Sequence, residues 1–170
     1  MLWIWIQALV VNGVLISFAQ RTPLLTTRGW IHAAALGTML WGSLGWRGWL
    51  AVAVYLVLGS LVTRIGFANK QHRGIAEARD GRRGPENVWG SAAVGAALAL
   101  ILAASPQDAI LWRQVVLIGF SASFAAKLAD TFGSEIGKRW GRTTVLITTL
   151  RPVAPGTDGA ISLEGTMASA

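Results

Sequence analysis

The sequence predicts an all-α protein that crosses a membrane several times. Of its 170 residues 53% are apolar and only 14% are Asp, Glu, Lys or Arg, against about 25% charged residues in soluble domains. The apolar residues form blocks long enough to cross a bilayer, each ended by charges or by Gly and Pro. Nine Trp residues agree with this prediction, because indole side chains favour the headgroup level of a bilayer.

Five apolar segments are expected to span the membrane. They cover residues 2–18, 30–44, 46–65, 88–104 and 111–129. A transmembrane helix needs about 20 apolar residues and tolerates about 17, so the second segment is short. The small residues that begin near residue 156 resemble the first turns of a sixth span. We therefore expect one transmembrane domain over residues 1–170, incomplete at its C-terminus, with cytoplasmic loops at 66–87 and 130–157.

The basic residues predict the orientation of these spans. With the N-terminus outside, thirteen of the 15 Lys and Arg residues fall on the cytoplasmic side, and only Arg47 and Arg113 fall outside. The positive-inside rule therefore predicts an outside N-terminus and a cytoplasmic polar face, in a cell inner membrane or a thylakoid membrane. The first apolar segment has no basic region before it, so we interpret it as a retained span rather than a signal peptide.

Composition also excludes several classes of function. There is no cysteine, which excludes disulfides and thiolate metal sites. A net charge of +7 would suggest nucleic acid as the partner of a soluble protein, but membrane topology explains these charges, and no nucleic acid is expected. His32 and His72 are too isolated to suggest metal ligands. No Ser lies in a G-x-S-x-G elbow, so a serine hydrolase is not supported.

The first polar segment is the basic loop at 66–87. Its candidate phosphate ligands are Lys70, Arg82 and Arg83, and its four glycines let backbone N–H groups approach an anion closely. The alternative is a solvated loop whose charges set the topology and contact anionic lipid headgroups. Both interpretations stay open at this point.

The second polar segment follows the fifth apolar block, at residues 127–138. Asp130 lies about 25 Å along a helix from Arg113, near the inner edge of the hydrocarbon. Ionisable residues at that depth are costly, and they tend to be paired or functional. The alternative is an ion pair between Lys127 and Asp130 that only ends the helix.

A carboxylate pair in this segment would suit a magnesium site. Mg²⁺ takes one or two protein carboxylates together with phosphate oxygens and water. Asp130 and Glu135 are the predicted metal ligands and, with Lys127, the predicted catalytic residues. In a continuous helix Glu135 points away from Asp130, so a shared metal requires a distortion near Gly133.

A third polar segment, at residues 148–166, is rich in glycine and hydroxyl side chains and could cradle an anion at a helix N-terminus. The same residues also serve turns and close helix packing. Candidate phosphate or nucleotide ligands from the last two segments are Ser134, Lys138, Arg151, Gly156, Thr157, Gly159, Ser162, Gly165 and Thr166. The run from Gly133 to Lys138 is not a P-loop, because its spacing is too short and no strand precedes it.

These segments together resemble one family. Residues 130–137 resemble a D-T-x-x-S-E-x-G signature, and residues 148–166 resemble a T-T-x-x-x-V-x-x-G-T-x-G-x-x-S-x-x-G-T signature. Lys70, Gly81, Arg82, Arg83 and Val88 match the family's basic loop. The family is called domain of unknown function 92, and it includes transmembrane protein 19 and the phytyl-phosphate kinases of plants and cyanobacteria. The chain looks most similar to the cyanobacterial members.

The resemblance implies a membrane-embedded kinase of tocopherol biosynthesis. It would transfer a phosphoryl group from a nucleotide, CTP, to an isoprenoid monophosphate such as phytyl phosphate, with Mg²⁺ as cofactor. Membrane lipid, the isoprenoid phosphate and the nucleotide are the implied partners. A transporter or permease is the main alternative, because an intramembrane Asp and small residues in helices also fit that class.

Overall fold

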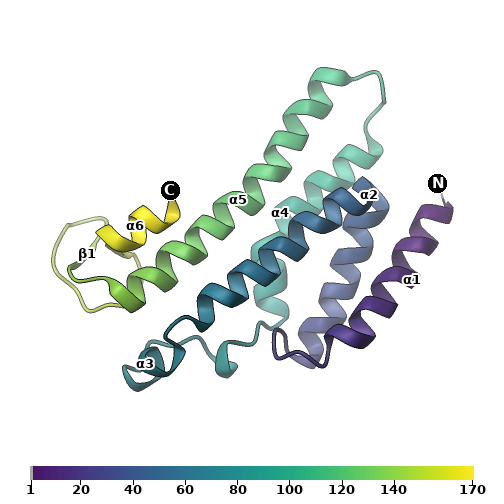
Figure 1. Cartoon of the computed structure of the whole chain (residues 1–170). Helices are drawn as coiled ribbons and strands as arrows, with labels where there is room; N and C mark the ends of the chain where they lie inside the picture. Colours follow the sequence, from purple (N-terminus) through teal and green to yellow (C-terminus); the bar gives the residue numbers. More distant parts are fainter. Residues whose placement is uncertain (1) are drawn as a thin grey trace. The chain divides into compact units, whose positions relative to one another are not determined.

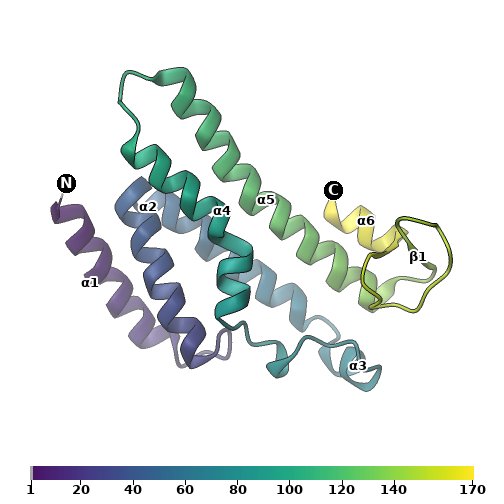
Figure 2. The same cartoon turned by 180° about the vertical axis from the view of Figure 1, so that it is seen from behind.

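The structure is a computed structural model that describes residues 2–170, and it confirms the all-α class. Its main elements appear in Figure 1, and Figure 2 shows them from behind. The helices are α1 (Leu2–Ala19), α2 (Thr27–Arg64), α3 (Phe67–His72), α4 (Pro85–Ala104), α5 (Ile110–Trp140) and α6 (Leu163–Ser169), with a 3₁₀ turn at Arg79–Gly81 and two strands, β1 (Thr144–Leu146) and β2 (Ala160–Ser162).

Within the described chain, four helices are long and apolar enough to cross a membrane, namely α1, α2, α4 and α5. The five predicted segments lie in these four helices because α2 contains two of them. Gly45 has φ 68° and ψ −164° and interrupts the helical backbone of α2. This interruption falls at the predicted boundary between the second and third segments.

The chain divides into two compact units. Unit 1 consists of Met1–Leu56 and Arg82–Ala125, and unit 2 consists of Val57–Gly81 and Ala126–Ala170. Helices α2 and α5 each contribute residues to both units. The single domain expected from the sequence stays a prediction.

The core of unit 1 combines small, aliphatic and aromatic side chains, with Trp30, Tyr55, Phe120 and Phe124 as its buried aromatic residues. Leu36, Leu40, Ala96 and Ala99 are among its buried residues. Asn12 is also buried, where its Nδ2 donates to the Ala8 carbonyl at 2.8 Å. The outer face of α1 instead exposes large apolar side chains, as expected for a helix bathed by lipid tails.

Two chain segments in unit 1 are held side by side by backbone hydrogen bonds. The Thr26 N–H donates to the Arg83 carbonyl at 3.0 Å, and the Arg83 N–H donates to the Leu24 carbonyl at 3.0 Å. The basic loop after α1 therefore lies next to the end of the basic loop at 66–87, as the predicted sidedness requires. Which side of the membrane this is stays a prediction.

The predicted loop at 130–157 is wrong in part. Residues 130–140 belong to α5, which runs to Trp140. Strands β1 and β2 then pair antiparallel, with Thr144 opposite Ser162 and Leu146 opposite Ala160. The β-branched residues around Val145 and Ile161 favour extended backbone. The short helix α6 follows β2 directly and begins at Leu163 rather than near residue 156.

Candidate functional site

The second half of α5 directs one face toward a cavity in unit 2. Asp130, Gly133, Ser134, Gly137 and Lys138 all line this cavity, and their spacing of three and four residues places them on one face of a helix. The distortion expected near Gly133 is absent, because α5 is helical throughout Ile110–Trp140. Successive residues of a helix turn by about 100°, so Glu135 lies on a different face from Asp130.

Glycines bring α6 against this face of α5. A Cβ atom built on Gly165 would lie 2.5 Å from the Gly133 carbonyl oxygen and 3.2 Å from the Gly137 Cα. A Cβ atom on Gly133 would collide with the Ser169 hydroxyl. The Gly133 and Gly137 pair is therefore a close-packing surface of the small-xxx-small kind, consistent with the rejection of a P-loop.

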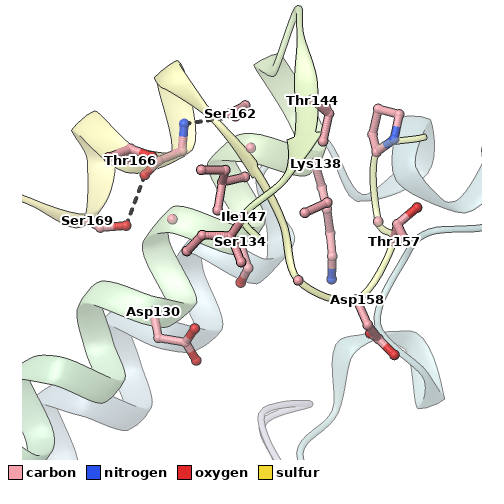
Figure 3. A pocket seen from close by; sticks show the side chains of 18 of the residues that line it. Asp130, Ser134, Lys138, Thr144, Ile147, Thr157, Asp158, Ser162, Thr166 and Ser169 are labelled. Carbon is pink, nitrogen blue, oxygen red and sulfur yellow. Dashed lines mark hydrogen bonds between the residues drawn. The ribbon is translucent and has the colours of Figure 1, made fainter. Parts of the chain in front are cut away.

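The hairpin, its connecting loop and α6 complete the cavity, whose volume is about 520 Å³. Gly156 and Gly159 turn the connecting loop with φ values of 88° and 75°, which glycine adopts without strain. At the start of α6 the Ser162 hydroxyl accepts from the Gly165 N–H at 3.1 Å. Figure 3 shows Thr157 and Asp158 on the connecting loop, which lies across from Asp130 and Ser134 on α5.

The charged groups around this cavity are mostly acidic. Asp130, Asp158 and Glu77 line it, and Lys138 is the one basic side chain among its described lining residues. Lys138 Nζ lies 3.1 Å from Glu77 Oε1 and 3.1 Å from Glu135 Oε1. Two carboxylates from separate segments therefore hold the lysine that faces the cavity.

A buried ion pair lies behind Lys138. Lys70 is 0% exposed, and its Nζ donates to the Thr63 carbonyl at 2.7 Å and to Glu135 Oε2. Glu135 is 2% exposed, so its two oxygens are occupied by Lys70 and Lys138. Lys70 was expected at an accessible phosphate, but the structure encloses it and pairs it with Glu135.

The other predicted residues divide into two groups. The cavity lining includes Asp130, Ser134, Lys138, Gly156, Thr157, Gly159, Ser162, Gly165 and Thr166. Lys127 lies one turn before Asp130, with Nζ 2.9 Å from Asp130 Oδ2, and both side chains are well exposed. Arg151 is exposed beyond β1 and does not line the cavity. Arg82 and Arg83 belong to unit 1.

Sequence reasoning missed four polar side chains that line the cavity, namely Glu77, Thr144, Asp158 and Ser169. Asp158 could have been found, because it lies inside the Gly156-Thr157-Asp158-Gly159 run already singled out. Glu77 lies in the basic loop, where the surrounding Arg residues drew attention away from it. Thr144 carries a buried hydroxyl oxygen without a hydrogen-bond partner among the described residues, and nothing in the sequence indicated it.

The donor set fits Mg²⁺ only in company with phosphate. Residues 2–170 contain no group of three or more His, Cys, Asp or Glu side chains that could hold a metal ion. Mg²⁺ needs only one or two carboxylates when phosphate oxygens and water complete its shell. Asp130 and Asp158 are the two aspartates that line the cavity, whereas Glu135 is 2% exposed and both of its oxygens contact lysines.

Comparison with known proteins places this fold and cavity in a family. Residues 10–170 match the family described as Integral membrane protein DUF92. The chain belongs to this family. The matched region contains every described residue that lines the cavity in unit 2. No solved structure matches the chain.

Three curated relatives are similar to this DUF92 chain over nearly all its length. Uncharacterized membrane protein sll0875 of Synechocystis is 51% identical over 96% of the chain and 63% of its own length. Protein VTE6, chloroplastic, of Arabidopsis thaliana is 43% identical over 95% of the chain and 49% of its own length. Uncharacterized membrane protein MJ0933 of Methanocaldococcus jannaschii is 30% identical over 95% of the chain and 63% of its own length. The chain thus spans between about half and just under two thirds of these relatives.

Proposed function

We propose that this DUF92 chain belongs to a membrane-embedded kinase that transfers a phosphoryl group from CTP to an isoprenoid monophosphate such as phytyl phosphate. The observation that carries the proposal is the cavity of unit 2. Residues of both signature segments, 130–137 and 148–166, converge on it. Its volume of about 520 Å³ lies within the usual range of small-molecule sites, which is about 300–1,000 Å³.

The charges at the cavity support a nucleotide that enters as its Mg²⁺ complex. Among its described lining residues, the cavity has three acidic side chains, from Asp130, Asp158 and Glu77, and one basic side chain, from Lys138. A triphosphate without a metal ion would therefore be repelled by the net negative charge. Asp130 and Asp158 would hold the metal ion, which neutralises phosphate charge when bound. This assignment replaces the predicted pair of Asp130 and Glu135.

The protein's own groups have positioning roles in this proposal. Phosphoryl transfer depends chiefly on positioning and charge stabilisation. Lys138 would contact the transferred phosphoryl group, and Glu135 and Glu77 fix its ammonium at 3.1 Å each. The loop glycines at 156 and 159 let backbone approach the phosphates closely. An oxygen of the lipid phosphate would attack the terminal phosphorus while the bond to the leaving diphosphate breaks, giving CDP and the lipid diphosphate.

A membrane position suits such a substrate. Its apolar chain would stay among the spans, while its phosphate would lie at the face that carries the polar loops. That face is the cytoplasmic one if the predicted orientation holds. A transporter would instead have its site near the bilayer midplane, between structural repeats.

The proposal is tested with the protein at its natural full length in membrane vesicles. CTP labelled at its terminal phosphate is incubated with phytyl phosphate and Mg²⁺, and labelled phytyl diphosphate is the expected product. Phytol, which lacks the acceptor phosphate, serves as the matched control and should give none. Uptake of label into vesicles without a labelled lipid would instead support a transporter.

A further inference from the structure

Unit 1 contains two neighbouring cavities that share lining residues. One is polar, with a volume of about 230 Å³, and it lies among residues 20–27 and Arg82. The other is apolar, with a volume of about 100 Å³, and it lies between α2 and the start of α4. Leu25 and Trp30 line both cavities. A polar compartment and an apolar one therefore lie next to each other at Leu25 and Trp30.

The polar compartment is suited to an anion. Arg21 and Arg82 line it together with Gln20, Thr22 and Thr27, and no described lining residue is acidic. The cavity in unit 2 differs, because acidic side chains predominate there. Two guanidinium groups with hydroxyl and amide neighbours form a typical donor set for phosphate.

The apolar compartment is suited to one hydrocarbon chain. Leu36, Val52, Leu56 and Val88 are among its lining residues. Its volume is comparable to a dry engineered cavity of about 150 Å³ that binds benzene, so it has room for one chain segment but not for two. Because the compartment lies among the helices, a longer chain would continue from it into the bilayer.

Arg83 supplies a fixed positive charge at the wall of the apolar compartment. Its Nη1 donates to the Tyr55 hydroxyl oxygen at 2.7 Å, and the Tyr55 and Ser91 hydroxyls share a hydrogen bond of 2.6 Å. The Arg83 guanidinium also lies 5.2 Å from the centre of the Tyr55 ring. These contacts hold the charge in place without a ligand.

Trp30 is a buried residue at the boundary between the two compartments. Its side chain is 6% exposed, and its indole Nε1–H has no hydrogen-bond partner among the described residues. Buried indole N–H groups usually find a partner. Trp30 lines both compartments, so its ring separates the polar lining residues from the apolar ones.

We propose that unit 1 binds a single-chain lipid with a phosphate monoester head. The head occupies the polar compartment beside Arg21 and Arg82, and the first carbons of the chain occupy the apolar compartment beyond Trp30. Naming an isoprenoid monophosphate as the natural ligand rests on the proposed function, in which the lipid phosphate reacts at the cavity of unit 2, so the site in unit 1 is a holding site that the phosphate leaves before it reacts. The site itself rests on the two cavities. The site is composed entirely of unit 1 residues.

A photocrosslinking experiment locates the site directly. Phytyl phosphate that carries a diazirine on its first isoprene unit is added, without nucleotide, to the full-length protein in nanodiscs. Labelled peptides should contain residues from 24–36, 49–56 or 83–92, and excess phytyl phosphate should abolish the label. Label spread over the outer face of α1, and not displaced by excess ligand, would overturn the proposal.

Competitors test the two halves of the ligand. Phytol shares the chain but has no phosphate, so it should displace the label at least about tenfold less well, because charge-assisted contacts are lost. Phosphatidic acid shares the phosphate monoester but has two chains, and it should also compete poorly. Equal competition by phytol would refute the phosphate compartment, and equal competition by phosphatidic acid would refute the single-chain site in favour of a general lipid headgroup site.

Variants test the named side chains. Arg21→Gln combined with Arg82→Gln should weaken phytyl phosphate binding about tenfold, whereas Arg47→Gln, at an exposed arginine near the start of the third segment, should not. The double Lys variant keeps both charges and should bind more tightly than the double Gln variant. Trp30→Ala removes the ring that lines both compartments and should weaken binding several-fold, and the exposed Trp46→Ala should have no effect. Equal binding by the double Lys and double Gln variants would contradict the proposal.

This experiment separates the lipid site from the kinase proposal. Asp130→Asn, which alters the cavity of unit 2, should leave crosslinking in unit 1 unchanged. A protein that labels as expected but transfers no phosphoryl group would retain the lipid site and lose the proposed function. An active kinase whose label falls outside unit 1 would retain the proposed function and lose the lipid site.

Discussion

Two faces of the second half of α5 carry acidic side chains in contrasting surroundings. Glu135 lies on the enclosed face, where it is 2% exposed and each of its carboxylate oxygens contacts a lysine. Asp130 lies on the cavity face, where its side chain is 66% exposed and its contact with Lys127 is an ordinary surface ion pair. The two carboxylates are little more than one helical turn apart.

The contrast indicates different uses for the same chemical group. A buried carboxylate stabilises a fold only while its partners remain, because an uncompensated charge away from water is costly. The contacts of Glu135 with Lys70 and Lys138 therefore hold segments of unit 2 in register. Asp130 retains oxygen atoms that can bind a ligand. This comparison ranks the effects expected from single substitutions.

The largest effect is expected for Lys70→Met. Removal of one partner from a buried ion pair typically costs about 3–5 kcal/mol, so this variant should lose most of its resistance to unfolding. The measurement is reversible unfolding in mixed detergent and SDS, followed by circular dichroism. The double variant Lys70→Met with Glu135→Leu should recover much of the loss, because it removes both charges together. Equal stability of Lys70→Met and the parent protein would contradict the enclosed pair.

Asp130→Asn should affect activity rather than stability. The variant keeps the size of the side chain and removes its charge, so turnover should fall at least about 100-fold, as for removal of other preorganised electrostatic groups. Its unfolding midpoint should stay close to that of the parent protein, because Asp130 is exposed. Phytyl diphosphate formation is the measurement, and Asp108→Asn, at an exposed position between α4 and α5, is the control. Near-normal activity of Asp130→Asn would indicate that the Lys127–Asp130 pair is only structural.

The spans could be predicted from the sequence because hydropathy is a local property. Each apolar block became helix, and the interruption of α2 fell at Gly45, between two predicted segments. The hairpin could not be predicted in the same way. Its strands are three residues long, and such short extended pieces depend on packing more than on intrinsic propensity.

The candidate site could be predicted from the sequence only in part. The part that was missed depends on contacts between residues far apart along the chain. Residues of the two signature segments do meet around one cavity. The pairing of Lys70 with Glu135 joins positions that are far apart in the sequence, and helical periodicity contains no information about such partners. Periodicity did place Glu135 away from Asp130, and the distortion assumed near Gly133 was an addition that the structure does not support.

Gly165→Ala should reduce stability less than Lys70→Met does, and it should also weaken nucleotide binding. Its Cβ would lie 2.5 Å from the Gly133 carbonyl oxygen, and overpacking of this kind costs about 1–3 kcal/mol. Because α6 would move away from α5, the Michaelis constant for nucleotide should also rise. Gly90→Ala, at a helical glycine with open space around it, is the matched control, which should leave the Michaelis constant unchanged and make unfolding no easier, because Ala favours helix. Unaltered behaviour of Gly165→Ala would show that α6 does not shape the cavity.

Lys127→Gln should have the smallest effect on stability, and it decides between two roles for the lysine. Exposed ion pairs contribute about 0.2–1 kcal/mol, so the unfolding midpoint should barely change. If Lys127 only screens Asp130, the variant frees the carboxylate, and the Mg²⁺ concentration required for half-maximal activity should fall. If Lys127 is a catalytic residue, as the sequence predicted, turnover should fall at every Mg²⁺ concentration. We expect the first result, because Lys127 does not line the cavity. A titration of activity against Mg²⁺ for Lys127→Gln and Lys127→Arg distinguishes these results, since only the arginine variant retains the pair.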